Sequence, residues 1–144
     1  MSYIRYKKNN LFMESVSVRR LASKLSTPFY LYSEASIIEN YKSFSNSFKK
    51  SKPLICFSVK ANSNIQILKV LKKIGSGADV VSGGELLKAL KSGIKPNRIV
   101  FSGVGKTEDE IKLAIRKNIL LINVESENEA ILINKIAGRL KKKI

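Results

Sequence analysis

The sequence has no histidine and no tryptophan, and it has a single cysteine among 144 residues. Without histidine, a Ser-His or Cys-His nucleophile pair cannot be built from this chain. The lone Cys56 excludes an internal disulfide framework and a cysteine-based zinc site, and it fits a reducing, cytoplasmic setting. No apolar stretch approaches the roughly 18 residues of a membrane span, and no signal-peptide core follows the basic N-terminus. We therefore expect no metal and no membrane partner.

Acidic residues are also few: the sequence has 11 Asp and Glu against 27 Lys and Arg, which gives a formal net charge of +16. Such a charge suits nucleic acid in principle. However, the basic residues are mostly lysine and are spread along the whole chain, with acidic residues between them. We expect a solvated lysine-rich surface and no nucleic-acid partner, and a basic nucleic-acid-binding module is the alternative.

Apolar runs of strand length alternate with helical patterns along most of the chain. The strand candidates are Phe29–Tyr32, Leu54–Val59, Ala78–Val81, Ile99–Phe101 and Leu120–Val124. This order predicts βα units around a parallel sheet whose two faces are both covered. An open doubly wound sheet and a (β/α) barrel both fit the pattern. Residues 1–27 stand apart, with a possible strand and a short helix, and could serve another domain.

Several polar residues and glycines mark where the helices should begin and end. Thr107 with Glu110, and Ser126 with Glu129, have the spacing of a capping box. Three glycines are expected to follow the ends of helices: Gly75, Gly93 and Gly138.

Lys60 lies at the end of the apolar run CFSVKAN. In an extended strand, Leu54, Cys56, Ser58 and Lys60 share one face, which becomes more polar toward the carboxyl end. Ligands of α/β proteins collect at that end of the sheet. A partly desolvated lysine amine there can be neutral and can form a Schiff base with an aldehyde such as pyridoxal phosphate. The plain alternative is a lysine that marks the exit of the strand into solvent.

Four motifs in a fixed order carry a family resemblance, and TPFYLYSE (27–34) precedes them. They are FSVKANSN (57–64), GADVVSGGEL (77–86), RIVFSGVGKTEDEI (98–111) and LLINVESENE (120–129). From about residue 11 to about 137 the chain resembles the diaminopimelate decarboxylase family, which shares a fold group with alanine racemase and ornithine decarboxylase. The resemblance implies a partial (β/α)8 barrel of about five βα units out of eight, without the C-terminal β domain. It implies a barrel domain at 28–144 and an N-terminal segment, 1–27, that packs near the missing β domain.

The same resemblance implies pyridoxal 5'-phosphate as the cofactor and Lys60 as the residue that binds it covalently. It places Asp79 and Glu85 at acidic positions facing the cofactor. Other roles remain open: Asp79 could pair with a nearby lysine, and Glu85 could be a first-turn residue favoured by the helix dipole. Asn62 could hydrogen-bond near the cofactor, although helix capping by Asn62 or Ser63 is preferred. Ser102 could line the site or belong to a turn.

Two glycine motifs suggest phosphate binding less strongly. Gly83 and Gly84 precede a helix, whose free N–H groups could hold phosphate, but we interpret them as tight-turn residues. The stretch GVGKT (103–107) does not have the P-loop spacing G-x-x-x-x-G-K-[ST], so we do not expect ATP binding there.

The implied reaction is the decarboxylation of meso-2,6-diaminopimelate to L-lysine and carbon dioxide. The implied partners are a small amino-acid substrate and, for the full-length family, a second subunit in a homodimer with shared active sites. The alternatives are a related decarboxylase acting on ornithine, arginine or carboxynorspermidine, or a non-catalytic pyridoxal-phosphate-binding protein. The family pattern continues with a cofactor-stacking histidine and a glycine-rich phosphate loop that this sequence lacks. We therefore expect a fragment that is poorly soluble and inactive alone.

Overall fold

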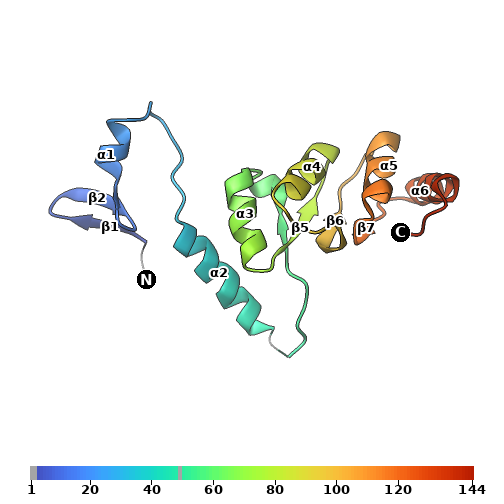
Figure 1. Ribbon diagram of the computed structural model, residues 1–144, viewed down its shortest axis with the longest axis horizontal. Helices are drawn as coiled ribbons and strands as arrows, with labels where there is room; N and C mark the ends of the chain where they lie inside the picture. Colours follow the sequence, from blue (N-terminus) through green and yellow to red (C-terminus); the bar gives the residue numbers. More distant parts are fainter. Residues whose placement is uncertain (1–2, 49) are drawn as a thin grey trace. The chain divides into compact units, whose positions relative to one another are not determined.

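The computed structural model describes residues 3–48 and 50–144, and the chain divides into two compact units, 1–49 and 50–144 (Figure 1). The first unit opens with an antiparallel sheet of β1 (Ile4–Lys7), β2 (Asn10–Met13) and β3 (Val16–Ser17). Lys8 and Asn9 have φ angles of 46° and 59°. A two-residue hairpin loop with both residues in this region is the type that matches strand twist.

Two helices complete the first unit: α1 (Val18–Ala22) and α2 (Glu34–Ser47). Ser33 caps α2, since its Oγ accepts a hydrogen bond from the Ser36 N–H at 2.9 Å. The Glu14 carboxylate accepts from Ser33 Oγ at 2.6 Å and from the Ala35 N–H at 3.1 Å, and these bonds lower the pKa of Glu14. The strand and short helix expected before residue 28 are thus present.

The strand expected at Phe29–Tyr32 does not form within the described residues. A strand requires a hydrogen-bonded neighbour as well as an apolar run, and this segment leads into α2 within the first unit without one.

The second unit is a four-stranded parallel sheet in which each strand is followed by a helix (Figure 1). Its strands, in spatial order, are β4 (Cys56–Ser58), β5 (Gly77–Val80), β6 (Ile99–Phe101) and β7 (Leu121–Ile122). Its helices are α3 (Ile65–Lys73), α4 (Gly83–Lys91), α5 (Glu108–Lys117) and α6 (Glu127–Leu140), with short 3-10 turns at Val59–Ala61 and Pro96–Arg98. In every pair of neighbouring strands of this sheet, a strand residue pairs with the residue 21 positions further along the chain. The predicted α/β class and parallel sheet are confirmed, with four strands in the sheet instead of five.

The two faces of each strand differ as strand geometry requires. Toward the helices, Ala78, Val80, Ile99 and Phe101 are fully buried. They meet an apolar stripe on the helices that includes the buried Leu68, Leu86 and Ile111. On the other face, Ser58, Asp79 and Ser102 remain only partly covered. The hydrophobic core therefore lies between sheet and helices, and the opposite face is left for polar side chains.

Helix ends follow the sequence signals in most places. Gly75 and Gly93 have φ angles of +87° and +90°, and each follows the C-cap residue of its helix, α3 or α4. The expectation for Gly138 is wrong, because it lies inside α6 and Lys141, at φ 53°, takes the left-handed position after the helix. An apolar stripe of α6 packs against α5 and consists of Ile133, Ile136 and Ala137. Leu140 continues this stripe, so packing stabilises the helix beyond Gly138.

Helix starts are also only partly as expected. The Thr107–Glu110 capping box is present in both directions. At α6, Ser126 accepts from the Glu129 N–H at 3.2 Å, but the Glu129 side chain does not return the bond to the cap. Asn64 caps α3 by accepting from the Gln66 N–H at 2.9 Å, so neither Asn62 nor Ser63 is the cap.

Candidate functional site

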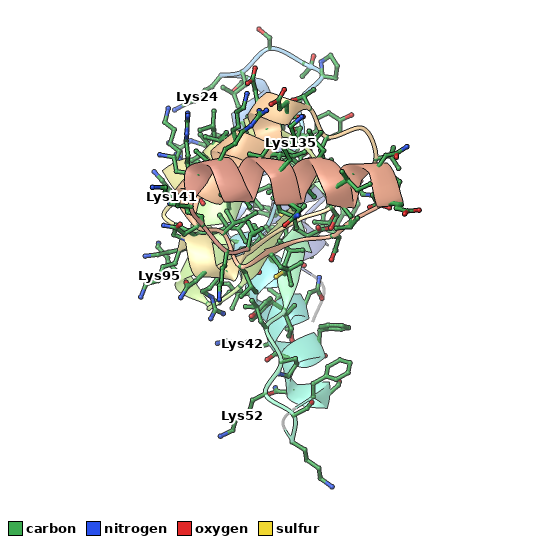
Figure 2. All side chains as sticks on the ribbon, turned by 90° about the vertical axis from the view of Figure 1, so that its right-hand side faces the viewer. Lys24, Lys42, Lys52, Lys95, Lys135 and Lys141 are labelled. Carbon is green, nitrogen blue, oxygen red and sulfur yellow. The ribbon has the colours of Figure 1, made fainter. Side chains whose placement is uncertain are left out.

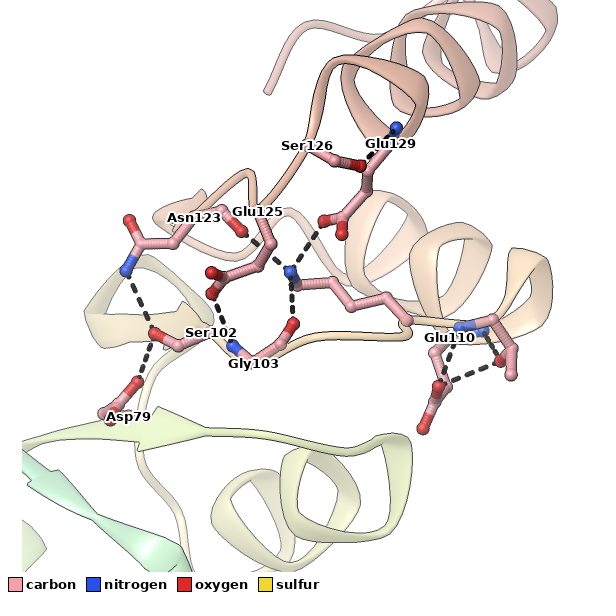
Figure 3. A network of polar contacts seen from close by, with 10 residues as sticks. Asp79, Ser102, Gly103, Glu110, Asn123, Glu125, Ser126 and Glu129 are labelled. Atoms are coloured by element: carbon pink, nitrogen blue, oxygen red, sulfur yellow. Dashed lines mark hydrogen bonds and ion pairs between the residues drawn. The ribbon is translucent and has the colours of Figure 1, made fainter.

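A row of polar side chains crosses the carboxyl ends of the four parallel strands. Figure 3 shows three of its members, Asp79, Ser102 and Asn123. Ser102 Oγ donates to Asp79 Oδ1 at 2.6 Å, and Ser58 Oγ lies 3.4 Å from Asp79 Oδ2. Asn123 Nδ2 donates to Ser102 Oγ at 3.0 Å. We call Ser58, Asp79, Ser102 and Asn123 the polar row. Each of the four strands supplies one member, either within the strand or just after it.

The strand register brings these side chains together. Ser58 and Asp79 are paired residues of β4 and β5 and point to the same face of the sheet. Ser102 and Asn123 each follow the last residue of their strand, and their N–H groups still donate to the preceding strand, to Val80 O and Phe101 O, at 2.8 Å each. Both side chains therefore continue the face that carries Asp79.

Lys60 lies two residues beyond Ser58, in the 3-10 turn Val59–Ala61 and not in the strand itself. Its side chain is exposed, so the described residues do not desolvate its amine as the sequence suggested. Within residues 3–48 and 50–144, the structure shows no hydrogen bond or ion pair that occupies this amine. A free primary amine thus lies just past the end of the strand that begins the polar row.

The other two predicted site residues have local partners. Asn62 Oδ1 accepts from the Asn64 N–H at 3.0 Å, in the turn before α3. Glu85, in the first turn of α4, accepts from the Val81 N–H at 2.9 Å through Oε2. The structure thus joins Asp79 and Ser102 directly, and it gives Asn62 and Glu85 roles in shaping the loops beside them.

Lys106 is a buried residue of the site that the sequence did not reveal. Its amine donates to Gly103 O at 2.8 Å, to Asn123 O at 2.7 Å and to Glu129 Oε1 at 2.7 Å (Figure 3). All three acceptors are protein oxygens, which differs from the phosphate contact of a P-loop lysine. These bonds tie the loop after β6 to the loop after β7, and so hold two members of the polar row in place.

The start of α4 is occupied by a carboxylate from another helix. Glu110 Oε1 accepts from the Gly83 N–H at 2.7 Å, while Oε2 accepts from the Thr107 N–H at 3.0 Å. The bond from Gly83, followed by those from Thr107, lowers the pKa of Glu110. Because an ionised carboxylate already complements this helix terminus, the first turn of α4 is poorly suited to phosphate.

Other chemistry has little support in the described part of the chain. Burial, with a smaller effect of the Asp79 carboxylate, raises the pKa of the Cys56 thiol, which disfavours the nucleophilic thiolate. In the ranges 3–48 and 50–144, no three His, Cys, Asp or Glu side chains lie close enough to hold a metal ion. Over those same ranges, no helix is long and apolar enough to cross a bilayer.

Residues 34–144, which include the whole polar row and Lys60, match the family described as "Pyridoxal-dependent decarboxylase, pyridoxal binding domain". The chain belongs to this family. Its cofactor is pyridoxal phosphate, and the similar solved structures have the barrel-type α/β fold that the sequence predicted.

Its relatives include diaminopimelate decarboxylases. That of Aquifex aeolicus is 48% identical over 141 residues, which are 98% of this chain and 33% of the relative. That of Helicobacter pylori is 53% identical over 114 residues, 79% of this chain and 28% of the relative. The chain therefore spans about a third of the length of the curated relatives that it matches.

Solved structures agree. Diaminopimelate decarboxylase from M. jannaschii superposes with a TM-score of 0.92 at 39% identity, covering 96% of this chain and 33% of that one. The Helicobacter pylori enzyme, solved in complex with L-lysine, gives a TM-score of 0.83 at 50% identity, covering 85% and 31%. A viral arginine decarboxylase at 22% identity, with a TM-score of 0.72, shares the fold.

The donor set of this pyridoxal-binding domain fits one end of the cofactor. An aldehyde needs an accessible primary amine, and Lys60 offers one beside the polar row. The hydroxyl, amide and carboxylate groups of the row can meet polar substituents of the ring. Fewer donors are available here for the phosphate of the cofactor, because the Gly83 N–H already donates to Glu110.

Proposed function

We propose that this chain is the lysine-bearing part of a diaminopimelate decarboxylase, which converts meso-2,6-diaminopimelate to L-lysine and carbon dioxide. The observation that carries the proposal is Lys60, whose amine no described residue occupies and which lies two positions after Ser58 of the polar row. It belongs to a chain that matches the pyridoxal-binding domain and is 48% identical to the Aquifex aeolicus enzyme over 98% of this chain. The L-lysine complex of the Helicobacter pylori relative supports a small amino-acid ligand.

Lys60 is the catalytic residue in this proposal, because its amine attaches the cofactor through the aldehyde. When bound, pyridoxal phosphate would supply an electron sink for the pair left on the substrate α-carbon as carbon dioxide departs, before a proton takes the place of the carboxyl group. Asp79 has both oxygens engaged, by Ser58 and Ser102, so its carboxylate is held in one orientation toward the site. A fixed carboxylate can stabilise a cationic group of cofactor or substrate without reorganising.

Ser102, Glu85 and Asn62 complete the proposed cofactor surroundings. The Ser102 hydroxyl donates a hydrogen bond to Asp79 Oδ1 and accepts one from Asn123 Nδ2, so it is oriented from both sides. Glu85 holds the Val81 N–H and thereby shapes the turn that follows Asp79. Asn62 holds the turn just after Lys60 through the Asn64 N–H. These three act mainly by positioning the lysine and the carboxylate.

Several features of the whole protein are part of the same proposal. We assign residues 28–144 to the barrel domain and residues 1–27 to a segment that packs near a β domain. We expect a homodimer with shared active sites, located in the cytoplasm. The reducing setting suggested by the lone Cys56 supports the last point.

Borohydride trapping tests the role of Lys60. The chain is mixed with less than one equivalent of pyridoxal phosphate, reduced and mapped by peptide mass spectrometry. We expect the label mainly on Lys60, and its loss from that peptide in Lys60→Arg. Lys69→Arg, an exposed lysine of α3, is the matched control. An even distribution of label over surface lysines, unchanged in Lys60→Arg, would contradict the proposal.

Substrate choice is tested on the cofactor-loaded chain. We expect meso-diaminopimelate to change the cofactor absorbance at lower concentration than L-ornithine or L-arginine does. The reverse order would favour one of the related decarboxylases instead.

A further inference from the structure

The fold separates charges that are mixed in the sequence. From residue 50 to 144, every acidic residue lies on the carboxyl-end side of the parallel sheet. Asp79 is in β5, and the other seven lie in loops that follow strands or in the first turns of helices: Glu85, Glu108, Asp109, Glu110, Glu125, Glu127 and Glu129.

Basic residues collect at the opposite end, where the helices finish and the strands begin. We define the basic face by eight exposed residues at the ends of α3 to α6 and before β6: Lys72, Lys73, Lys91, Lys95, Arg116, Lys117, Lys141 and Lys143. Figure 2 shows Lys95 and Lys141 on the same side of the molecule.

Hydrogen bonds confirm that these segments are neighbours. Arg98 donates to Gly75 O, which links the start of β6 to the end of α3. The Leu120 N–H donates to Pro96 O at 3.1 Å. Lys142 Nζ donates to Arg116 O at 3.2 Å and to Asn118 Oδ1 at 2.7 Å, which joins the end of α6 to the end of α5.

The basic face has no acidic counterpart within its own unit. Among the described residues, the ion pairs are Lys106 with Glu129, Lys112 with Glu108 and Asp109, and Arg139 with Glu108, and none includes a residue of the basic face. The helix dipole stabilises one or two cations at each helix end, but ends placed side by side also bring their charges together. This repulsion is relieved when an anion with many charges binds.

The arrangement of the helices suits a linear polyanion. Strand order equals chain order, and α3, α4, α5 and α6 pack each against the next, so their ends form a row (Figure 1). Packed helices are about 10 Å apart, so the charges of the row recur at roughly that spacing. The aromatic residues of this unit are Phe57 and Phe101, both on the helix-facing side of the sheet, so none is available to stack bases.

We propose that the basic face binds nucleic acid through its phosphate backbone, independently of base sequence. Phosphate contacts supply affinity without sequence information, and bases are otherwise held by aromatic stacking that this face lacks. The expectation of no nucleic-acid partner depended on the even spread of basic residues along the sequence, and the βα repeat brings the eight residues of the basic face to one end of the unit. This proposal does not depend on the decarboxylase activity.

Binding of nucleic acid by the basic face is tested by fluorescence anisotropy. The probe is a labelled oligo-dT of about 20 nucleotides, titrated at about 50 to 200 mM salt. The variant Lys73→Gln/Lys95→Gln/Lys117→Gln is compared with Lys7→Gln/Lys24→Gln/Lys42→Gln, which removes the same charge from exposed positions of the first unit. Each phosphate contact on a single strand contributes about 0.7 to the slope of log K against log salt. We therefore expect the first variant to bind more weakly with a slope shallower by about 2, and the second to stay near the parent.

A second set, Lys91→Gln/Lys141→Gln/Lys143→Gln, guards against misfolding of the first, and circular dichroism monitors all three. Equal losses in the face variants and in the control would overturn the proposal, because net charge alone would then explain binding. Face-dependent binding to vesicles of phosphatidylserine and phosphatidylcholine, without binding to oligo-dT, would also overturn it in favour of a membrane surface.

Discussion

Lys106 Nζ lies 2.7 Å from Glu129 Oε1, and the two side chains expose only 1% and 10% of their surface. The same amine binds the carbonyl oxygens of Gly103 and Asn123. A single buried cation therefore satisfies one acceptor from the first turn of α6 and two from the loops after β6 and β7, and those loops carry Ser102 and Asn123 of the polar row.

Lys106→Met should strongly destabilise the second unit. It leaves the Glu129 carboxylate and two loop carbonyls without their donor, and removal of one partner of a buried pair costs about 3–5 kcal/mol. Urea unfolding followed by circular dichroism measures the change. Lys106→Met/Glu129→Leu removes both charges and should recover part of the loss. If the double variant is less stable than the single one, the ion pair is not the source of the effect. Lys69→Met serves as an exposed control.

Acid should weaken the link between α4 and α5. Hydrogen bonds from Gly83 and Thr107 lower the pKa of Glu110 below its model-compound value of 4.5. A carboxyl with a lower pKa in the folded than in the unfolded state stabilises the fold above its unfolded pKa, and the contribution disappears as the pH falls through the folded value. The free energy of unfolding should therefore decrease below about pH 4.5.

Glu110→Gln should flatten that pH dependence, with a loss of up to about 1 kcal/mol at neutral pH, because a partly exposed carboxylate is screened by water. Glu127→Gln removes the same charge from the first turn of α6 as a control. Denaturant titrations from pH 3 to 7 provide the comparison. An unchanged pH profile in Glu110→Gln would show that this carboxylate is not responsible. The pKa of Glu14 in the first unit is also lowered, so Glu14 contributes the same loss of stability in acid to both variants.

Gly77→Ala should disturb the pairing of β5. A Cβ at this position would lie 2.5 Å from Arg98 O and 2.7 Å from Cys56 Sγ. The first contact is with backbone, which cannot rotate away, so we expect a loss of about 1–3 kcal/mol, as for other overpacked sites. Gly84→Ala is the matched control, because its nearest neighbour, Ser82 Oγ, would be 3.9 Å away. In the first turn of α4 that change should be neutral or stabilise by up to about 1 kcal/mol. Thermal unfolding of both variants measures the difference in their stability. Equal unfolding midpoints would contradict the steric argument.

Asp79→Asn should reduce cofactor attachment at Lys60 about 10-fold without unfolding the chain, because it removes a charge that Ser58 and Ser102 hold in place. The measurement is the yield of borohydride-trapped Lys60 peptide against pyridoxal phosphate concentration. Asp109→Asn, an exposed acidic residue of α5, should have no effect. Equal yields for both variants would exclude Asp79 from the cofactor site.

Local pattern predicted the parallel sheet, because apolar runs of strand length alternate with helical patterns. The expectation that both faces of the sheet are covered is wrong for the described residues, since only the helix-facing side is fully buried. Ile99–Phe101 agrees residue for residue with β6, whereas the run Leu54–Val59 is a strand only over Cys56–Ser58. Apolar character marks what can be buried, but strand bounds depend on which backbone groups find partners. For the same reason the apolar run Phe29–Tyr32 does not form a strand, and Lys60 lies in a turn instead of at a strand end.

The site was only partly predictable. Motif order pointed to Lys60, Asp79 and Ser102, but it missed Asn123 and Lys106. Asn123 lies 21 positions after Ser102, the same offset that relates Ser58 to Asp79, so a search at the strand period could have found it. Lys106 follows a glycine loop and looks exposed in sequence. Its burial depends on Glu129, whose spacing from Ser126 suggested a capping role instead, and only the fold shows which partner that carboxylate takes.

The constant offset between paired strands also bears on how the second unit reaches its native state. Each new strand joins the one just completed, so every step closes a short segment of chain, and the entropy lost in each closure is modest. Folding is faster when contacting residues are closer in sequence, and strands 21 residues apart are closer than strands from distant segments of a chain. We expect the strands to add one after another to a local nucleus, each beside the strand that precedes it in the chain, without a search for distant parts of the chain.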